Sequence, residues 1–287
     1  MKNWQLNKID EQLIDLALKE DLNDPFCDIT SETIFDSEIK QQARIISKHA
    51  TSIVLCGIPV LNAIIKRVHN TCEIKTHYND GDIINPGEML LTITGPAKVL
   101  LMLERTLLNF LQRLSAIATL THAFAEKIKD TQTKILDTRK TTPGMRHLEK
   151  YAVYCGGGVN HRIGLYDAVM IKDTHVDLIG GMSKALACLP AQLSKNMPVI
   201  VEVRDLNELD IVLQEGLGKI NRVLLDNMTI KQLRNCVAKC YNKIATEASG
   251  NITLENITAI AATGVNFASI GKITHSAGIV DLSMKCD

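Results

Sequence analysis

The second half of the chain alternates short apolar runs with longer stretches of helical spacing. Six apolar runs follow one another from residue 134: Lys134–Asp137, Ala168–Lys172, Pro198–Val203, Asn221–Asp226, Lys243–Glu247 and Asn266–Gly271. The helical stretches between them include Met182–Leu193, Leu206–Glu215, Ile230–Cys240 and Leu254–Ala262. Strands that alternate with helices form parallel βα units, so this region is either a βα-barrel or an open doubly wound sheet. No Gly-x-Gly-x-x-Gly motif follows the first run, which counts against a dinucleotide-binding fold.

The first hundred residues mix the two periodicities. One helical face near the N-terminus carries Ile9, Leu13, Leu16 and Ala17. Short β-like runs, separated by turn-forming residues, are predicted at Ala43–Ser47, Ile53–Leu55, Cys72–Thr76, Ile83–Ile84 and Met89–Thr94, with a helix over Val60–Val68. Gly95 and Pro96 then open a long helix whose apolar face extends from Val99 to Leu114.

Cationic side chains gather near the ends of the first two runs of the second half. Arg139 and Lys140 follow the first run, Lys172 closes the second, and His161 with Arg162 lies between them after three glycines. The chain has 32 basic and 32 acidic residues, so such a cluster suggests a site for an anion. A solvated basic face is the alternative interpretation. It is weakened because the active site of a βα-barrel is built at the carboxyl ends of its strands.

The remaining runs end in carboxylates or in small polar residues. Glu202 and Asp226 end neighbouring runs, where they could hold Mg²⁺ or form structural ion pairs with the nearby lysines. Ser249-Gly250-Asn251 precedes a predicted helix, and the segment from Gly271 to Ser276 follows the last run. Both segments have the composition of a phosphate-binding loop, although either one alone is more often an ordinary tight loop.

The composition of the chain argues against several functional classes. Aromatic residues make up only 4% of the chain and there is no basic surplus, which argues against nucleic-acid binding. The longest apolar stretch, Ile53 to Ile65, is interrupted and too short to cross a membrane, and the N-terminus lacks the apolar core of a signal peptide. The eight cysteines show no Cys-x-x-Cys spacing, which favours reduced thiols in a cytoplasmic protein over a structural metal site.

Several long motifs in a fixed order resemble one known family. Asp137–Gly144, Gly156–Arg162, Leu225–Met228 and Glu247–Ile252 are similar to motifs of the quinolinate phosphoribosyltransferases, and the resemblance covers nearly the whole chain. The resemblance implies an α/β fold with an N-terminal α/β sandwich domain over residues 1–110, which the tail 276–287 joins. An incomplete six-stranded βα-barrel over residues 111–275 would form the catalytic domain.

The resemblance also implies an activity. A phosphoribosyl group would pass from phosphoribosyl pyrophosphate to quinolinate with decarboxylation, giving nicotinate mononucleotide, pyrophosphate and CO₂, with Mg²⁺ and without an organic cofactor. A homodimer would share its active sites, with Arg105 of the partner subunit reaching into each. The quinolinate carboxylates would bind to Arg105, Arg139, His161, Arg162 and Lys172. The phosphoribosyl side would use Ser249, Gly250, Asn251, Gly271 and His275 together with the catalytic residues Lys140, Glu202 and Asp226, the last two near Mg²⁺.

Some positions depart from the family pattern, and two rival functions stay open. Ile200 and Arg204 replace glutamates that often flank the position of Glu202, Ala116 replaces a glycine, and Lys272 replaces a small residue. One rival is a phosphoribosyltransferase for another acid, such as nicotinate, or a molybdenum-associated paralogue. The other is a phosphometabolite-binding protein without turnover. The surplus of cations favours a dicarboxylate ligand, and the combination of a lysine with two carboxylates favours an enzyme.

Overall fold

The computed structural model describes residues 4–35, 39–190 and 193–286, which form two compact units. The first unit comprises Met1–His122, Thr141–Gly157 and Ile273–Asp287, and the second comprises Ala123–Lys140 and Gly158–Lys272. Helix α4 (Ala97–Lys127) contributes residues to both units. In the described part of the chain, no helix is both long and apolar enough to span a membrane.

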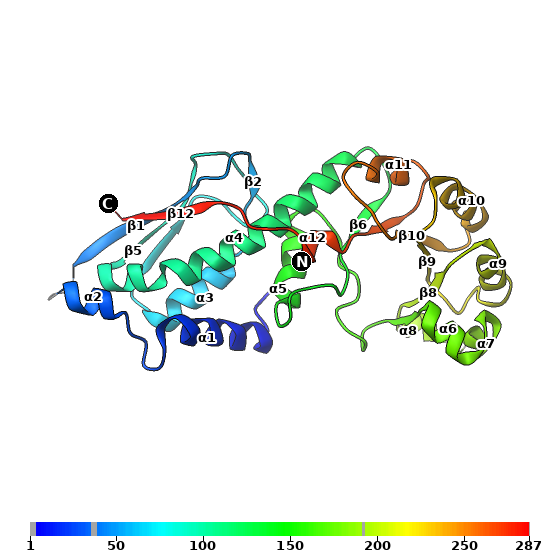
Figure 1. The fold of residues 1–287 in the computed structure, drawn as a ribbon, viewed down its shortest axis with the longest axis horizontal. Coiled ribbons are helices and arrows are strands. Elements are labelled where there is room, and N and C mark those ends of the chain that lie inside the picture. Colours follow the sequence, from blue (N-terminus) through cyan, green and yellow to red (C-terminus); the bar gives the residue numbers. More distant parts are fainter. Residues whose placement is uncertain (1–3, 36–38, 191–192, 287) are drawn as a thin grey trace. The chain divides into compact units, whose positions relative to one another are not determined.

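An antiparallel sheet of four strands forms the frame of the first unit (Figure 1). Its order is β12-β1-β5-β3, and the strands are β1 (Lys40–Ser47), β3 (Glu73–Thr76), β5 (Met89–Pro96) and β12 (Leu282–Cys286). A separate pair joins β2 (Ile53–Val54) to β4 (Ile83–Ile84). The predicted N-terminal strands are therefore confirmed. The register of β12 on β1, from Ala43↔Cys286 to Ser47↔Leu282, ties the C-terminus into this unit.

Helix α1 (Lys8–Leu22) contains the apolar face named from the sequence, but that face is not the one the helix buries. The buried positions are Asp10, Ile14, Leu18 and Leu22, whereas Ile9 and Leu16 are 59% and 64% exposed. The buried face begins with a carboxylate, so apolar periodicity alone passed over it. Asp10 is held by the ring of His147 at 2.5 Å and by the helix-capping contact with Asn7. Such partners make a buried carboxylate tolerable.

The first unit contains four further helices in the described residues. They are α2 (Ile29–Ile34), α3 (Ile58–Val68), α5 (Arg146–Cys155) and α12 (Lys272–His275), and α12 begins at the last residue of the second unit. Helix α3 lies against α1 and has proline in its first turn, where a missing N–H costs least. Both α3 and the long α4 were predicted from their apolar spacing and are confirmed.

A parallel sheet of six strands forms the second unit (Figure 1). Its order is β7-β8-β9-β10-β11-β6, and all six predicted runs are strands: β6 (Lys134–Leu136), β7 (Val169–Ile171), β8 (Val199–Val203), β9 (Arg222–Asp226), β10 (Ala245–Ser249) and β11 (Phe267–Ser269). Within the described residues no pairing joins β6 to β7. The unit is therefore the incomplete six-stranded barrel that was expected.

Helices connect these strands. They are α6 (Asp173–Ile179), α7 (Met182–Ala187), α8 (Leu193–Asn196), α9 (Leu206–Glu215), α10 (Ile230–Cys240) and α11 (Ile257–Ala261). The bounds of α9 and α10 agree with the prediction, and α11 is shorter than predicted. The single helix predicted over Met182–Leu193 is wrong: α7 ends at Ala187, before Pro190, which disfavours a helical residue in front of it. Residues 191 and 192 of that prediction lie outside the described residues.

Candidate active site

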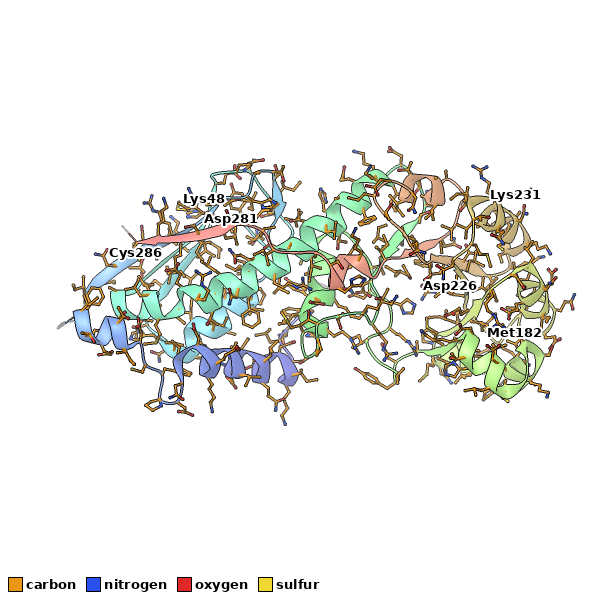
Figure 2. The ribbon with its side chains drawn as sticks, viewed as in Figure 1. Lys48, Met182, Asp226, Lys231, Asp281 and Cys286 are labelled. Atoms are coloured by element: carbon orange, nitrogen blue, oxygen red, sulfur yellow. The ribbon has the colours of Figure 1, made fainter. Side chains whose placement is uncertain are left out.

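Polar residues line the carboxyl edge of the parallel sheet. Because all six strands run in the same direction, their C-terminal ends meet at this edge. Lys172 directly follows β7, and Glu202 is the penultimate residue of β8. Asp226 ends β9, where Figure 2 labels it. Ser249 ends β10 in register with Asp226. The structure therefore brings the predicted strand-end residues of this unit to one edge.

Glu202 and Asp226 form an acidic pair at this edge. Burial raises the pKa of Glu202 above its ordinary value, and the negative charges of Asp226 and Asp173 add to this effect. The charge of Lys172 and the backbone N–H of Asp173 act in the opposite direction. Two half-buried carboxylates that repel each other offer hard oxygen ligands, so the donor set fits Mg²⁺.

Arg139 and Arg162 form a cationic pair in the same unit. Arg139 and Lys140 are exposed, whereas Arg162 is half-buried and donates from Nη1 to the carbonyl of Ala168 at 3.0 Å. Burial lowers the pKa of Arg162, and the positive charge of Arg139 lowers it further. The negative charge of Asp167 acts in the opposite direction. Two guanidinium groups that influence each other in this way suit an anion with two carboxylates.

His161 is held in a buried network that sequence reasoning did not predict. Its ring is 6% exposed, with Nε2 3.4 Å from Oε1 of Glu247, a carboxylate with no exposed surface. Burial alone would raise the pKa of Glu247, but contact with His161, the charge of Arg222 and the hydroxyl of Ser269 lower it overall. Asp137, also fully buried, accepts the backbone N–H of His161 at 2.8 Å. The sequence did offer a signal for this network: Asp137 and Glu247 each belong to an apolar run. A carboxylate that a buried strand carries inside the protein is expected to have partners there.

The loop after β10 packs tightly on the loop after β9. Gly250 has φ +96°, and a Cβ there would overlap the side chain of Asn227 and lie 3.0 Å from its backbone nitrogen. Asn251 and Asn227 both have positive φ, 51° each, and Nδ2 of Asn256 donates to the carbonyl of Asn251 at 2.9 Å. This close approach is the physical reason for a glycine in the predicted phosphate-binding loop.

The remaining predicted residues follow the last strand of the sheet or belong to the first unit. Gly271 follows β11 in the second unit, and Lys272 beside it is exposed. Arg105 is exposed on α4 and His275 is exposed on α12, with Nδ1 2.5 Å from the hydroxyl of Ser276. Both belong to the first unit.

The two replaced glutamate positions, one on β8 and one directly after it, have clear structural roles. Ile200 is 2% exposed and belongs to the core of the second unit. Arg204 is exposed and pairs with Glu208 at 2.5 Å and with Asp177 at 3.0 Å. Neither side chain supplies a carboxylate, so Glu202 is the acidic residue that β8 contributes to the edge.

The turn after Lys140 is fixed by a buried carboxylate within the first unit. Glu149 on α5 has no exposed surface and accepts the hydroxyl of Thr142 at 2.7 Å and its backbone N–H at 3.2 Å. Arg113 on α4 pairs with the same carboxylate at 2.8 Å. This group was also missed from the sequence, because a glutamate on a helix is usually read as a surface residue.

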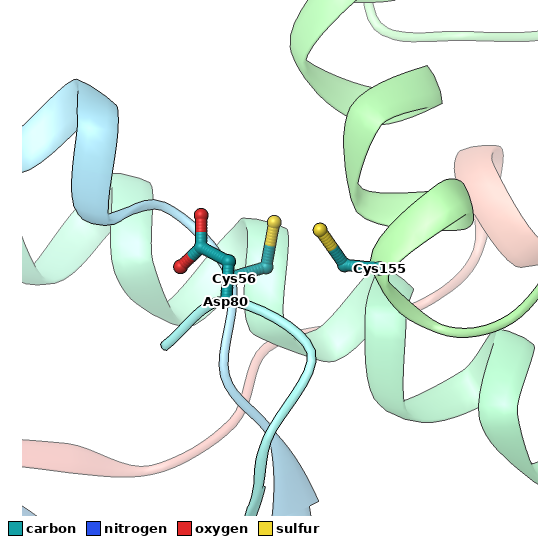
Figure 3. Close-up of side chains that lie close together, drawn as sticks. All are labelled: Cys56, Asp80 and Cys155. Atoms are coloured by element: carbon teal, nitrogen blue, oxygen red, sulfur yellow. The ribbon is translucent and has the colours of Figure 1, made fainter. Parts of the chain in front are cut away.

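A second group of reactive side chains lies in the first unit, apart from the residues predicted for the site (Figure 3). Cys56, Asp80 and Cys155 place one possible ligand atom each within 4.8 Å of one another. Asp80 already accepts the backbone N–H groups of Gly57 and Ile58 at 3.0 and 3.1 Å and the hydroxyl of Tyr151 at 2.9 Å. Burial raises the pKa of the Cys56 thiol, and Cys155 and Asp80 raise it further. The carboxylate is committed to capping α3, and the raised pKa of Cys56 disfavours the thiolate that a metal ion needs, so this group is a poor metal site.

Comparison with known proteins gives matches over almost the full length. The family model for the quinolinate phosphoribosyl transferase N-terminal domain matches residues 28–115, and that for the C-terminal domain matches residues 117–285. The probable nicotinate-nucleotide pyrophosphorylase (carboxylating) of Bacillus subtilis is 40% identical over 276 residues, covering 94% of this chain and 93% of its own length. The chloroplastic nicotinate-nucleotide pyrophosphorylase (carboxylating) of Oryza sativa subsp. japonica is 37% identical, covering 96% and 77%.

A solved structure agrees with these matches. The nicotinate-nucleotide pyrophosphorylase from Francisella tularensis superposes with a TM-score of 0.92 at 38% identity, over 99% of this chain and 98% of that one.

Proposed function

Because this chain belongs to the quinolinate phosphoribosyltransferase family, we propose that it transfers phosphoribosyl from phosphoribosyl pyrophosphate to quinolinate with decarboxylation. The products are nicotinate mononucleotide, pyrophosphate and CO₂, so the enzyme serves NAD biosynthesis. The observation that carries the proposal is the arrangement of the second unit. Its carboxyl edge holds the acidic pair Glu202 and Asp226, and the unit also contains the cationic pair Arg139 and Arg162.

The cationic pair binds the aromatic acid. Arg139 and Arg162 neutralise the two adjacent carboxylates of quinolinate, with Lys172 as a third cation. The repulsion between the two guanidinium groups supports this role, because a monocarboxylate would leave part of it uncompensated. Binding both carboxylates fixes the plane of the ring and thereby aims its nitrogen at the ribose.

The acidic pair and the glycine loops bind the phosphoribosyl substrate. Glu202 and Asp226 would hold Mg²⁺, directly or through water and the ribose hydroxyls, and the bound ion would supply charge stabilisation for the departing pyrophosphate. Lys140 adds positive charge on the same side. The carboxylates also stabilise the positive charge that develops on the ribose carbon. Ser249, Gly250, Asn251, Gly271 and His275 complete the phosphate and ribose contacts.

The chemistry then proceeds in two steps. The pyridine nitrogen forms a bond to the ribose carbon as the bond to pyrophosphate breaks, and the leaving group takes the electron pair. The ring nitrogen is now cationic. When the adjacent carboxylate leaves as CO₂, the ring accepts the electrons of the broken carbon–carbon bond, and a proton then replaces the carboxylate.

We propose further that the enzyme is a homodimer with shared active sites, completed by Arg105 of the partner subunit. The exposure of Arg105 on α4 supports this, since it leaves the guanidinium accessible to a second chain. A cytoplasmic location is part of the proposal. It is supported by the eight cysteines, all of which are free thiols, as expected in a reducing compartment.

The test compares aromatic acids. Purified protein with phosphoribosyl pyrophosphate and Mg²⁺ is expected to release pyrophosphate with quinolinate and not with nicotinate. Release with nicotinate instead would favour a related transferase. Binding of phosphoribosyl pyrophosphate without release in either case would favour the phosphometabolite-binding protein.

A further inference from the structure

We infer that Arg113 is a positioning residue, which anchors two segments of the chain that the proposed phosphoribosyl site uses. One segment follows Lys140, and the other carries His275. The inference rests on the proposed function, because both residues are assigned there to the phosphoribosyl substrate. It adds to that site a residue that acts through the backbone and side chains it holds.

Both segments begin where the chain enters the first unit. The chain passes from the second unit to the first after Lys140 and again after Lys272, so Thr141–Gly157 and Ile273–Asp287 belong to the same unit as Arg113. Substrate contacts carried beside such an entry point keep a fixed place only if the entering segment is itself held.

The first anchor runs through Glu149. Arg113 on α4 is 20% exposed, and its Nη2 lies 2.8 Å from Oε1 of Glu149, which has no exposed surface. The same oxygen accepts the hydroxyl of Thr142 at 2.7 Å, and Oε2 accepts the backbone N–H of Thr142 at 3.2 Å. Thr142 comes two residues after Lys140. Because a buried carboxylate is costly without its counter-charge, the turn at Thr142 depends on Arg113 as well as on Glu149.

The second anchor joins Arg113 to the C-terminal segment. Nη2 donates to the backbone carbonyl of Thr274, and Nη1 donates to that of Gly278 at 3.4 Å. Helix α12 has only four residues, so its carbonyl groups depend on partners outside the helix, and a cation is favoured at a helix C-terminus. Thr274 is fully buried, and His275 is the next residue. The guanidinium therefore holds the backbone that presents His275.

The preceding residue on α4 reinforces the second anchor. Nε2 of Gln112 donates to the carbonyl of Leu282 at 3.1 Å, and the backbone carbonyl of Gln112 accepts the N–H of Val280 at 3.3 Å. Leu282 begins β12, which pairs with β1. The C-terminal segment is therefore attached to α4 at two places, and Arg113 holds the place next to His275.

The planar guanidinium makes both anchors at once. Nε and Nη2 face Oε1 of Glu149 at 3.3 and 2.8 Å, while Nη1 and Nη2 also reach the two carbonyls. A lysine at this position would keep a positive charge beside Glu149, but its single ammonium could not also reach both carbonyls. Arg113→Lys therefore separates the first anchor from the second.

The test compares Arg113→Met and Arg113→Lys with Arg67→Met as the matched control. Arg67 on α3 also pairs with carboxylates of another helix in the first unit, Glu11 and Asp15 on α1. We expect Arg113→Met to lower kcat and raise the KM for phosphoribosyl pyrophosphate about tenfold, while the KM for quinolinate changes less than about twofold. Arg113→Lys is expected to raise the KM for phosphoribosyl pyrophosphate about threefold, and Arg67→Met to change either KM less than about twofold. Equal rises of both KM values in Arg113→Met, or no rise, would overturn the inference.

Two readouts without turnover separate this inference from the proposed function. Backbone hydrogen exchange is expected to quicken over both 141–149 and 273–281 in Arg113→Met, but only over 273–281 in Arg113→Lys. Binding of inorganic pyrophosphate with Mg²⁺ is expected to weaken about tenfold in Arg113→Met. Faster exchange in only one segment of Arg113→Met would overturn the inference, whereas an unmodified protein without turnover would contradict the proposed function alone. Should Arg113→Met fail to fold, unchanged exchange over 273–281 in Arg113→Lys would overturn the inference.

Discussion

At the scale of single residues, the site is built from charges that would be unfavourable without a ligand or a partner. Arg162 is half-buried near Arg139, and Glu202 is half-buried near Asp226. Fully buried Glu247, in contrast, has Arg222, Ser269 and His161 as partners. Arg162 and Glu202 therefore have the character expected of substrate and metal sites, whereas Glu247 has that of a structural residue.

Gly250 offers a direct test of the tight loop contact. Gly250→Ala must place a Cβ against Asn227 in addition to adopting φ +96°, so we expect a loss of at least about 2 kcal/mol in unfolding free energy and weaker binding of phosphoribosyl pyrophosphate. Gly218→Ala is the matched control, because Gly218 has φ +83° with no atom within 4 Å of the added Cβ. It is expected to cost about 1 kcal/mol by urea denaturation. Equal losses in the two variants would contradict the packing argument.

The pKa of Glu247 predicts how stability depends on pH. It is lowered in the folded protein, so its stabilising effect is present above the ordinary glutamate value of about 4.3 and is lost as pH falls through the lower folded value. The stability difference between the unmodified protein and Glu247→Gln should be largest near neutral pH and shrink below about pH 4.3. Urea titrations at a series of pH values measure it. A difference that grows on acidification would be the opposite of this prediction.

At the scale of elements, much of the fold could be predicted and the buried carboxylates could not. The apolar runs predicted all six parallel strands, and the helical spacing of Ile230–Cys240 predicted α10. The face of α1 was mistaken, and Glu149 and Glu247 were missed, for one physical reason. Periodicity identifies buried apolar positions, but a buried carboxylate is stabilised by partners distant in sequence, such as Arg113 for Glu149 and Arg222 for Glu247.

Substitution of Glu149 tests whether a buried carboxylate and its partners stabilise the turn at Thr142. In Glu149→Ala, Arg113 and the Thr142 turn lose their acceptor, so we expect a loss of about 3 kcal/mol in unfolding free energy. Because Thr142 lies two residues after Lys140, kcat is also expected to fall. The exposed Glu73→Ala on β3 is the control. Urea denaturation of both variants measures the difference, and a change below about 1 kcal/mol in Glu149→Ala would show that the pair contributes little.

At the scale of the whole molecule, the chain forms two units, and the proposed active site takes Arg105 from a second chain. The strand ends of the second unit could be predicted from sequence because parallel strands bring their carboxyl ends to one edge. The division into units could not be read from periodicity. The first unit is assembled from three separate segments of the chain, one of which lies between two segments of the second unit.

The shared active site can be tested by mixing variants. Arg105→Ala and Arg139→Ala are each expected to abolish most activity, and in a mixed dimer one of the two sites receives both intact arginines. After the two variants are unfolded together and refolded, activity should return to about a quarter of that of the unmodified protein. Refolded single variants serve as controls. A mixture that stays as inactive as its components would contradict the contribution of Arg105 from the partner subunit.

The central claim is that this chain converts quinolinate into a nucleotide and releases its adjacent carboxylate. The measurement that tests it most directly follows nicotinate mononucleotide and CO₂ together, using quinolinate labelled in the carboxylate next to the ring nitrogen, with phosphoribosyl pyrophosphate and Mg²⁺. We expect one labelled CO₂ for each nucleotide formed, and neither product when Mg²⁺ is chelated. Nucleotide formation that leaves the label in the product, or no nucleotide at all, would contradict it.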